Sequence, residues 1–152
     1  MRKVRPGLAS RTPPEAVLIY GGETLQKRAD VTVALVETCR AHGVPAAVER
    51  TCSGAGAHVW IFFTAPVPAV TARQMGCFLL TETMTRRHEL SMASYDRLFP
   101  NQDTLPKGGF GNLIALPLQH QARGQGNTVF VDDAFVPFPD EEGTTPWGRH
   151  DQ

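Results

Sequence analysis

A segment with helical periodicity stands between two short apolar runs, and this arrangement constrains the fold more than any other feature of the chain. Apolar side chains recur three or four positions apart over residues 23–42, and Gly43 follows where helices commonly end. The apolar run 16–20 leads into two glycines, which is typical of a strand and a turn. Residues 45–50 predict a second strand. The chain therefore begins with a strand, a helix and another strand.

A hairpin and a second helix are predicted next. Residues 53–57 form a Gly-rich turn, and the apolar run 58–64 that follows it can pair with the strand before the turn. Pro66 and Pro68 end that strand. Helical spacing returns over residues 71–90, with basic side chains near the end, where positive charge suits the helix dipole.

The second half of the chain has weaker patterns. Residues 91–112 include two prolines and a glycine cluster, and they predict a long irregular loop, which is more often functional than idle. Residues 113–116 and 127–131 predict short strands on either side of the polar segment 119–126. The complete order, β-α-β-β-α-loop-β-β, predicts a two-layer α+β domain with helices on one face of a mainly antiparallel sheet.

Composition and charge limit the classes of function. Lys and Arg together number 15, as do Asp and Glu, so a nucleic-acid-binding surface would have to be local. The three cysteines have unrelated spacings, which favours reduced and mostly buried thiols over a disulfide framework or a zinc site. No window of the sequence is apolar enough to span a membrane, and no signal peptide is evident, so we expect a cytoplasmic protein.

The length of 152 residues predicts a single domain. Residues 1–15 are polar and basic and contain prolines, so we expect a flexible tail there. Residues 16–139 hold all the predicted helices and strands. Residues 140–152 are expected to fray, because acidic residues and proline replace the apolar pattern.

The turn that joins Ser53 to His58 carries groups that suit a polyphosphate. Gly54 and Gly56 let the backbone approach a phosphate closely, and the amides of such a turn can form an anion nest. The Ser53 hydroxyl can donate a hydrogen bond, and the His58 imidazole can donate or carry charge. The alternative is structural, since Gly-rich hairpin tips are common and a histidine that begins a strand usually serves the fold.

A second group of polar residues lies within the predicted loop. Asp96 and Asp103 carry the oxygen ligands that Mg²⁺ prefers. Arg97 and Lys107 carry charges that can meet phosphates. The alternative is turn chemistry, because Asp side chains also cap turns and pair with neighbouring cations.

Taken in this order, three segments resemble the archaeo-eukaryotic primase superfamily, and above all the primase domain of TOTE conflict systems, which are linked to mobile elements. The segments are residues 53–63, 94–103 and 108–119, and the resemblance extends over roughly residues 22–139. It implies an RRM-like primase-polymerase core. It also implies a nucleotidyltransferase that uses a nucleoside triphosphate, a DNA or RNA template, and Mg²⁺ or Mn²⁺.

The resemblance also implies roles for individual residues. It gives a set of nucleotide-binding residues in the turn and the later loop: Ser53, Gly54, Gly56, His58 and Lys107. It implies catalytic roles for His58 and Asp103, and makes Asp103 the metal ligand, as the acid ahead of an apolar strand. Asp96 is the alternative acid, and Asp103 is preferred because it lies nearer the predicted strand 113–116.

The first acidic motif of the family has no counterpart in this chain. Its two acids should lie on the strand before the first helix, but Ile19 and Gly21 occupy those positions and cannot bind a metal. Glu15 and Glu23 flank the strand, yet a strand alternates its faces, so neither is a convincing substitute. The upstream module of the family is also unmatched. Because one carboxylate cannot organise two metal ions, metal binding by this chain is in question.

Three hypotheses about function follow. In the first, the chain is a truncated, degenerate primase-polymerase domain that is inactive alone. In the second, it is a non-catalytic module that binds a nucleotide or nucleic acid and acts with a helicase or nuclease partner. In the third, it is a gene fragment without a selected function, which would not fold stably by itself.

Overall fold

The structure is a computed structural model that describes most of the chain between the first predicted strand and the predicted C-terminal tail. The described residues are 17–20, 25–90, 95, 97–102, 108 and 115–139, with only the backbone described for 17–20 and 25–29. Several sequence predictions therefore lie outside the described residues: the tails 1–15 and 140–152, Gly21, Asp96, Asp103 and Lys107.

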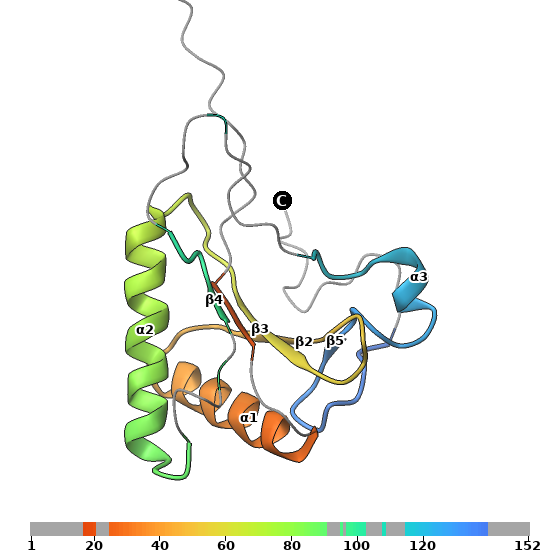
Figure 1. Ribbon diagram of the computed structural model, residues 1–152, viewed down its shortest axis with the longest axis horizontal. Helices are drawn as coiled ribbons and strands as arrows, with labels where there is room; N and C mark the ends of the chain where they lie inside the picture. Colours follow the sequence, from red (N-terminus) through yellow and green to blue (C-terminus); the bar gives the residue numbers. More distant parts are fainter. Residues whose placement is uncertain are drawn as a thin grey trace, which may run out of the picture.

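Strands and helices alternate along the described chain in the order that the sequence predicts for its first half (Figure 1). The elements are β1 (Val17–Tyr20), α1 (Leu25–Ala41), β2 (Ala47–Arg50), β3 (Ala57–Ile61), α2 (Ala69–Arg86), β4 (Arg97–Phe99), α3 (His120–Arg123) and β5 (Phe130–Val131). The strands form one sheet in the order β4-β1-β3-β2-β5, and every neighbouring pair is antiparallel. The first six elements have the connectivity of the RRM-like split βαβ fold, and β5 extends its edge. The α+β fold is therefore confirmed.

The two predicted helices are confirmed, with different ends for the second. Helix α2 begins directly after Pro68, whose carbonyl accepts hydrogen bonds from the amides of Thr71 and Ala72. It ends at Arg86 rather than at residue 90, and the Arg87 amide closes its last turn by donating to Thr83. Proline often marks the start of a helix because its backbone angle φ is fixed. The sequence prediction began this helix too late, at residue 71.

The second half of the sheet differs from the prediction. Strand β4 lies inside the segment 91–112 that was predicted to be a loop, and it is recruited by pairing with β1. Within the predicted strand 127–131, only β5 is a strand, because Thr128 has a φ of 51°, in the left-handed region that strands exclude. Of the predicted strand 113–116, the described residues 115 and 116 are irregular. The predicted strand 58–64 ends early, at Ile61.

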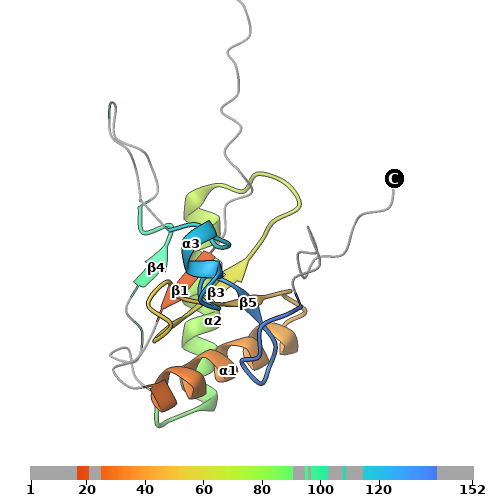
Figure 2. The ribbon, with the colours of Figure 1, turned by 90° about the vertical axis from the view of Figure 1, so that its right-hand side faces the viewer.

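Helices α1 and α2 cover one face of the sheet and contact each other (Figures 1 and 2). Figure 2 shows the sheet between α1 and the short helix α3, so α3 departs from the prediction of helices on one face. The buried core between sheet and helices consists of apolar side chains and one cysteine thiol: Leu35, Cys39, Val59, Ile61, Ala72, Leu79 and Leu80. We call this side of the sheet the helix-covered face.

The opposite face of the sheet carries the alternate residues of the same strands. A second apolar cluster there comprises Ala47, Trp60 and Phe130, with Phe62 and Phe99 packed against it. Residues paired across neighbouring strands share a face, so the pairing of Ala47 with Trp60 places both on this side. We call this side the opposite face, and it holds the polar residues of the candidate site.

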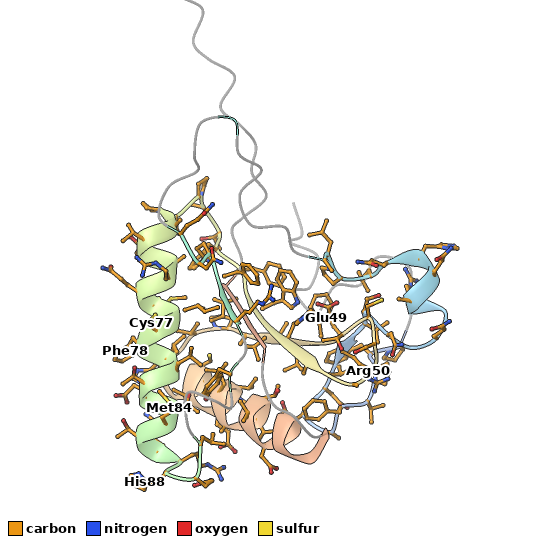
Figure 3. All side chains as sticks on the ribbon, in the orientation of Figure 1. Glu49, Arg50, Cys77, Phe78, Met84 and His88 are labelled. Carbon is orange, nitrogen blue, oxygen red and sulfur yellow. The ribbon has the colours of Figure 1, made fainter. Side chains whose placement is uncertain are left out.

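The thiols and the helices bear on two of the compositional predictions. The cysteines form no disulfide, but the prediction that they are mostly buried is wrong, because only Cys39 is buried while Cys52 and Cys77 are exposed. Figure 3 shows Cys77 on the side of α2 that points away from the sheet. Among the described helices, none combines the length and the apolar character needed to cross a membrane.

Candidate nucleotide-binding site on the opposite face of the sheet

The Gly-rich turn between β2 and β3 is held by its own hydrogen bonds. The Gly54 amide donates to the Thr51 carbonyl at 2.9 Å. The Ala55 amide donates to Ser53 Oγ at 3.3 Å, and the Gly56 amide donates to Thr51 Oγ1 at 3.0 Å. The amides predicted to form an anion nest therefore have acceptors inside the turn. A phosphate that binds the Ala55 and Gly56 amides would have to replace the two hydroxyl oxygens.

Gly54 is required by the shape of this turn. Its φ of +73° is readily adopted only by glycine, and a Cβ atom there would lie 2.8 Å from Asn127 Oδ1. Asn127 belongs to the segment that leads into β5, so the turn packs closely against a distant part of the chain. Gly54 thus has a structural role that is independent of any ligand.

His58 lies next to this turn, on the second residue of β3, and a buried carboxylate holds its ring. Nδ1 of His58 is 3.0 Å from Oε2 of Glu49, its partner across the strand pair. The indole Nε1 of Trp60 donates to the same oxygen at 2.6 Å. The Glu49 side chain is only 1% exposed, whereas that of His58 is 15% exposed. A buried carboxylate therefore fixes a histidine that solvent can still reach.

Glu49 is the site residue that the sequence prediction missed. It was included in the strand 45–50 without a role, because a single glutamate in a short strand normally faces solvent. The hairpin did not supply the missing signal, because counting outward from the middle of the predicted turn 53–57 would pair Cys52 with His58. The observed register is instead centred between Ser53 and Gly54, and it pairs Glu49 with His58 and Ala47 with Trp60. The acid therefore belongs to the face of the sheet that carries the predicted histidine.

Arg50, the next residue of β2, is committed to the fold (Figure 3). Its Nη1 donates to the Gly126 carbonyl at 2.9 Å, and its Nη2 donates to the Phe135 carbonyl at 2.7 Å. These two hydrogen bonds hold the segments before and after β5 against β2. The guanidinium therefore binds two backbone carbonyls of the fold instead of offering its charge to a phosphate.

The register of β1 shows which of its positions lie on the same face as His58. Tyr20 is paired with His58 and Leu18 is paired with Trp60, while Ile19 is paired with Val59 of the helix-covered core. Ile19, the position predicted for the family's first acid, therefore falls in register with the helix-covered face. No residue of β1 is acidic. Strand β1 thus provides no carboxylate beside His58.

Away from the predicted site, a groove of about 720 Å³ lies between α1, β2 and the segment after β5. Ser53 and His58 do not line it. Its lining includes apolar side chains and one ion-paired arginine: Val36, Arg40, Val44, Val48, Val131 and Phe138. The groove and the candidate site are therefore separate features.

Comparison with known families gives one match. The family model for the archaeo-eukaryotic primase domain of TOTE conflict systems matches residues 22–144. The chain belongs to this family. No curated protein matches it at a significant level. The resemblance predicted from three segments is thereby confirmed, and the molecule is a primase-like domain of a conflict system.

The family match covers both predicted helices and the Gly-rich turn but does not cover β1. The matched region begins at residue 22, so β1, the strand expected to bear the first acidic motif, lies before it. The matched region includes both the Ser53–His58 turn and the later loop. The residues predicted to bind phosphate therefore lie inside the matched region, and the strand predicted to lack the first acid pair lies outside it.

The described residues of this primase-like domain do not fit a two-metal site. Within them, no three His, Cys, Asp or Glu side chains are grouped so that they could hold one metal ion. Glu49 lies beside His58, but its Oε2 already accepts two hydrogen bonds and its side chain is buried. The family is generally metal-dependent, and the predicted ligand Asp103 lies outside the described residues.

Proposed function

We propose that this primase-like domain binds the phosphates of a nucleoside triphosphate or of a nucleic acid at the Ser53–His58 turn, and does not transfer nucleotides by itself. One observation carries the proposal. The residues of β1 paired with His58 and Trp60 are Tyr20 and Leu18, so the strand that should supply the metal-binding acids supplies none beside the histidine. In our proposal, the domain keeps the phosphate-binding element and lacks the catalytic one.

Binding is supported by the position and the partner of His58. The ring is partly exposed near the start of β3, which follows the turn, and its Nδ1 lies 3.0 Å from Oε2 of Glu49. Ser53 is exposed within the turn and can contribute its hydroxyl. We propose that Gly54 and Gly56 allow the backbone to approach the phosphates, and that Lys107 adds a charge.

Catalysis would require more carboxylates than this arrangement supplies. Nucleotidyl transfer by two metal ions depends on acids that hold both ions and neutralise the developing charge. In our proposal, Asp103 is the one family acid retained, with Asp96 as its alternative, so Mg²⁺ or Mn²⁺ would be held too weakly for efficient transfer. The domain would then contribute binding to an assembly in which a helicase or nuclease partner acts. The folded unit we propose is residues 16–139.

The test separates binding from catalysis. A fluorescent nucleoside triphosphate is titrated into the full chain, and anisotropy gives Kd for the wild type, His58→Ala and the matched control His88→Ala. His88 is exposed and lies just beyond the far end of α2 (Figure 3). Loss of a charge-assisted hydrogen bond should weaken binding about 10-fold in His58→Ala and leave the control unchanged. Equal affinities in all three proteins would refute the binding site.

The catalytic part of the proposal is tested by primer extension with Mg²⁺ or Mn²⁺ and labelled nucleotides. We expect no extension above background from the isolated domain. Extension that disappears in Asp103→Ala would show that the domain is active without the first acid pair, and would overturn this part of the proposal.

A further inference from the structure

Glu49 occupies a position that an apolar residue would normally hold. It lies on the same face of the sheet as Ala47 and is paired with Phe130 on its other side. A carboxylate without solvent costs several kcal/mol, and a well-packed apolar side chain is often as stable or more stable at such a place. The acid must therefore be explained by the groups that it binds.

Both groups that bind Glu49 approach one oxygen, and for an ionised Glu49 this decides which nitrogen of the histidine is the donor. Trp60 Nε1 can only donate, and it uses Oε2 as its acceptor. When Glu49 is a carboxylate, Oε2 can only accept, so Nδ1 of His58, at 3.0 Å, carries the hydrogen of their shared bond. The ring is further restrained by an edge contact with Trp60, with ring centroids 6.3 Å apart.

We infer that Glu49 is the positioning residue of His58, holding its ring with Nδ1 protonated and bound inward, so that Nε2 is directed to the phosphate. This inference rests on the proposed function for the identity of the ligand only. For Nε2 to donate to a phosphate oxygen, the ring must take up a second proton from solvent, so that both ring nitrogens carry hydrogen and the Glu49 carboxylate faces the resulting charge. Trp60 in turn keeps the carboxylate in place through its indole N–H.

The inference gives Glu49 a role different from that of a metal ligand. A metal ion would have to reach a carboxylate that is almost completely buried and whose Oε2 already has two hydrogen-bond partners. Glu49 therefore acts through His58 and does not replace the missing acid pair of the family.

The decisive measurement is the tautomer of His58 in the full chain without ligand. Long-range ¹H–¹⁵N correlation spectra distinguish a proton on Nδ1 from one on Nε2, and His58→Ala identifies the signal. We expect the neutral ring of the wild type to carry its proton on Nδ1, and Glu49→Leu to move it to Nε2. Glu82→Gln is the matched control, because Glu82 lies 3.7 Å from a different histidine, His42, and should leave the His58 signals unchanged.

A wild-type ring protonated on Nε2 alone would overturn the inference, and for this result only the His58→Ala variant used for the assignment has to fold. Binding of inorganic tripolyphosphate provides the second measurement. Glu49→Gln keeps the size and an acceptor oxygen but removes the charge, so we expect affinity to fall about 5-fold. If the wild type binds tripolyphosphate and Glu49→Gln binds equally well, the positioning role fails while the proposed function stands. If the tautomer behaves as expected but no phosphate binds, the proposed function fails and the Glu49–His58 pairing stands.

Discussion

The two faces of the sheet are built from alternate residues of the same strands, yet they differ in chemistry. On the helix-covered face, Val59 and Ile61 of β3 pack against apolar side chains of α1 and α2. On the opposite face, His58 and Trp60 of the same strand bind a buried carboxylate. One strand therefore contributes at once to the core and to the candidate site.

Buried polar groups are handled differently on the two sides. The helix layer contains Thr38 and Thr83, whose hydroxyls bond to each other and to backbone carbonyls, so neutral groups satisfy neutral groups. The opposite face buries the ionisable group Glu49, for which an apolar side chain would serve stability at least as well. The comparison teaches that stability explains the helix-covered face, whereas the opposite face needs a functional reason.

The largest effect is expected in the helix-covered core. Leu35 is 0% exposed, and Leu35→Ala should lower the free energy of unfolding by about 2–5 kcal/mol because it leaves a cavity. Val136, which is 55% exposed, is the control, and Val136→Ala should change stability by less than about 0.5 kcal/mol. Urea denaturation followed by circular dichroism measures both. Similar losses in the two variants would contradict the assignment of the core.

On the opposite face, we expect a smaller loss of stability when a single hydrogen-bond donor is removed. Trp60→Phe keeps an aromatic ring for stacking on Phe62 but removes the N–H that binds Glu49. The free energy of unfolding should fall by about 1–3 kcal/mol, because a buried carboxylate loses one of its donors. A double-mutant cycle with Glu49→Leu sharpens the result, since the cost of Trp60→Phe should shrink once the acceptor is gone. An unchanged cost would show that the hydrogen bond does not contribute.

In the turn between β2 and β3, replacing a glycine should lower stability by straining the backbone. Gly54→Ala places a side chain at a φ of +73° and against Asn127, whereas Gly43→Ala has a similar φ of +67° and nothing within 4 Å. We expect a cost of about 1–2 kcal/mol from the backbone in both variants, with a further loss only at Gly54. Chemical denaturation measures the difference. Adding Asn127→Ala should bring the cost of Gly54→Ala down to that of Gly43→Ala, and a persistent gap would point to another clash.

The smallest effect concerns the thiols. Burial raises the pKa of Cys39 from its ordinary value of 9.0 to about 11, while Cys52 and Cys77 are exposed. A disulfide reagent at pH 8 should therefore label two thiols quickly and Cys39 slowly. Because the pKa is raised on folding, the associated stability is present below about pH 9 and is lost as the pH rises toward 11. Cys39→Ala should reduce this alkaline loss, and rapid labelling of all three thiols would contradict the burial.

A second raised pKa lies at the edge of the helix-covered core. Burial raises the pKa of Tyr95 to about 12, and its hydroxyl is buried without a hydrogen-bond partner among the described residues. Tyr95 packs against the apolar core, so its ring serves the fold. Its ionisation would add to the alkaline loss of stability at a higher pH than that of Cys39.

Much of the first half of the fold could be predicted because its signals are local. Helix α1 has apolar side chains at helical spacing and a glycine after its end, and the hairpin is marked by a Gly-rich turn between apolar runs. The later strands could not be found in this way. Strand β4 has three residues, too few for an alternating pattern, and exists through its pairing with β1. Strand β5 is shortened by the left-handed backbone of Thr128, which no local signal announced.

The residues of the candidate site also differ in whether the sequence could predict their roles. Ser53, the glycines and His58 could be selected from the sequence because they are close together in one turn. The roles of Asp103 and Lys107 stay predictions, since both residues lie outside the described part of the chain. Arg50 could not be understood from the sequence, because the carbonyls that it binds are 76 and 85 residues away.

By itself, the sequence determined the family, the two long helices and the division of residues 57–61 into alternate faces, because periodicity and contiguous motifs need no distant partner. Only the tertiary structure decided that Glu49 is buried and that it holds His58. The solvation of a carboxylate depends on the side chains that surround it, and those of Glu49 come from β3 and β5, which meet β2 only in the folded sheet.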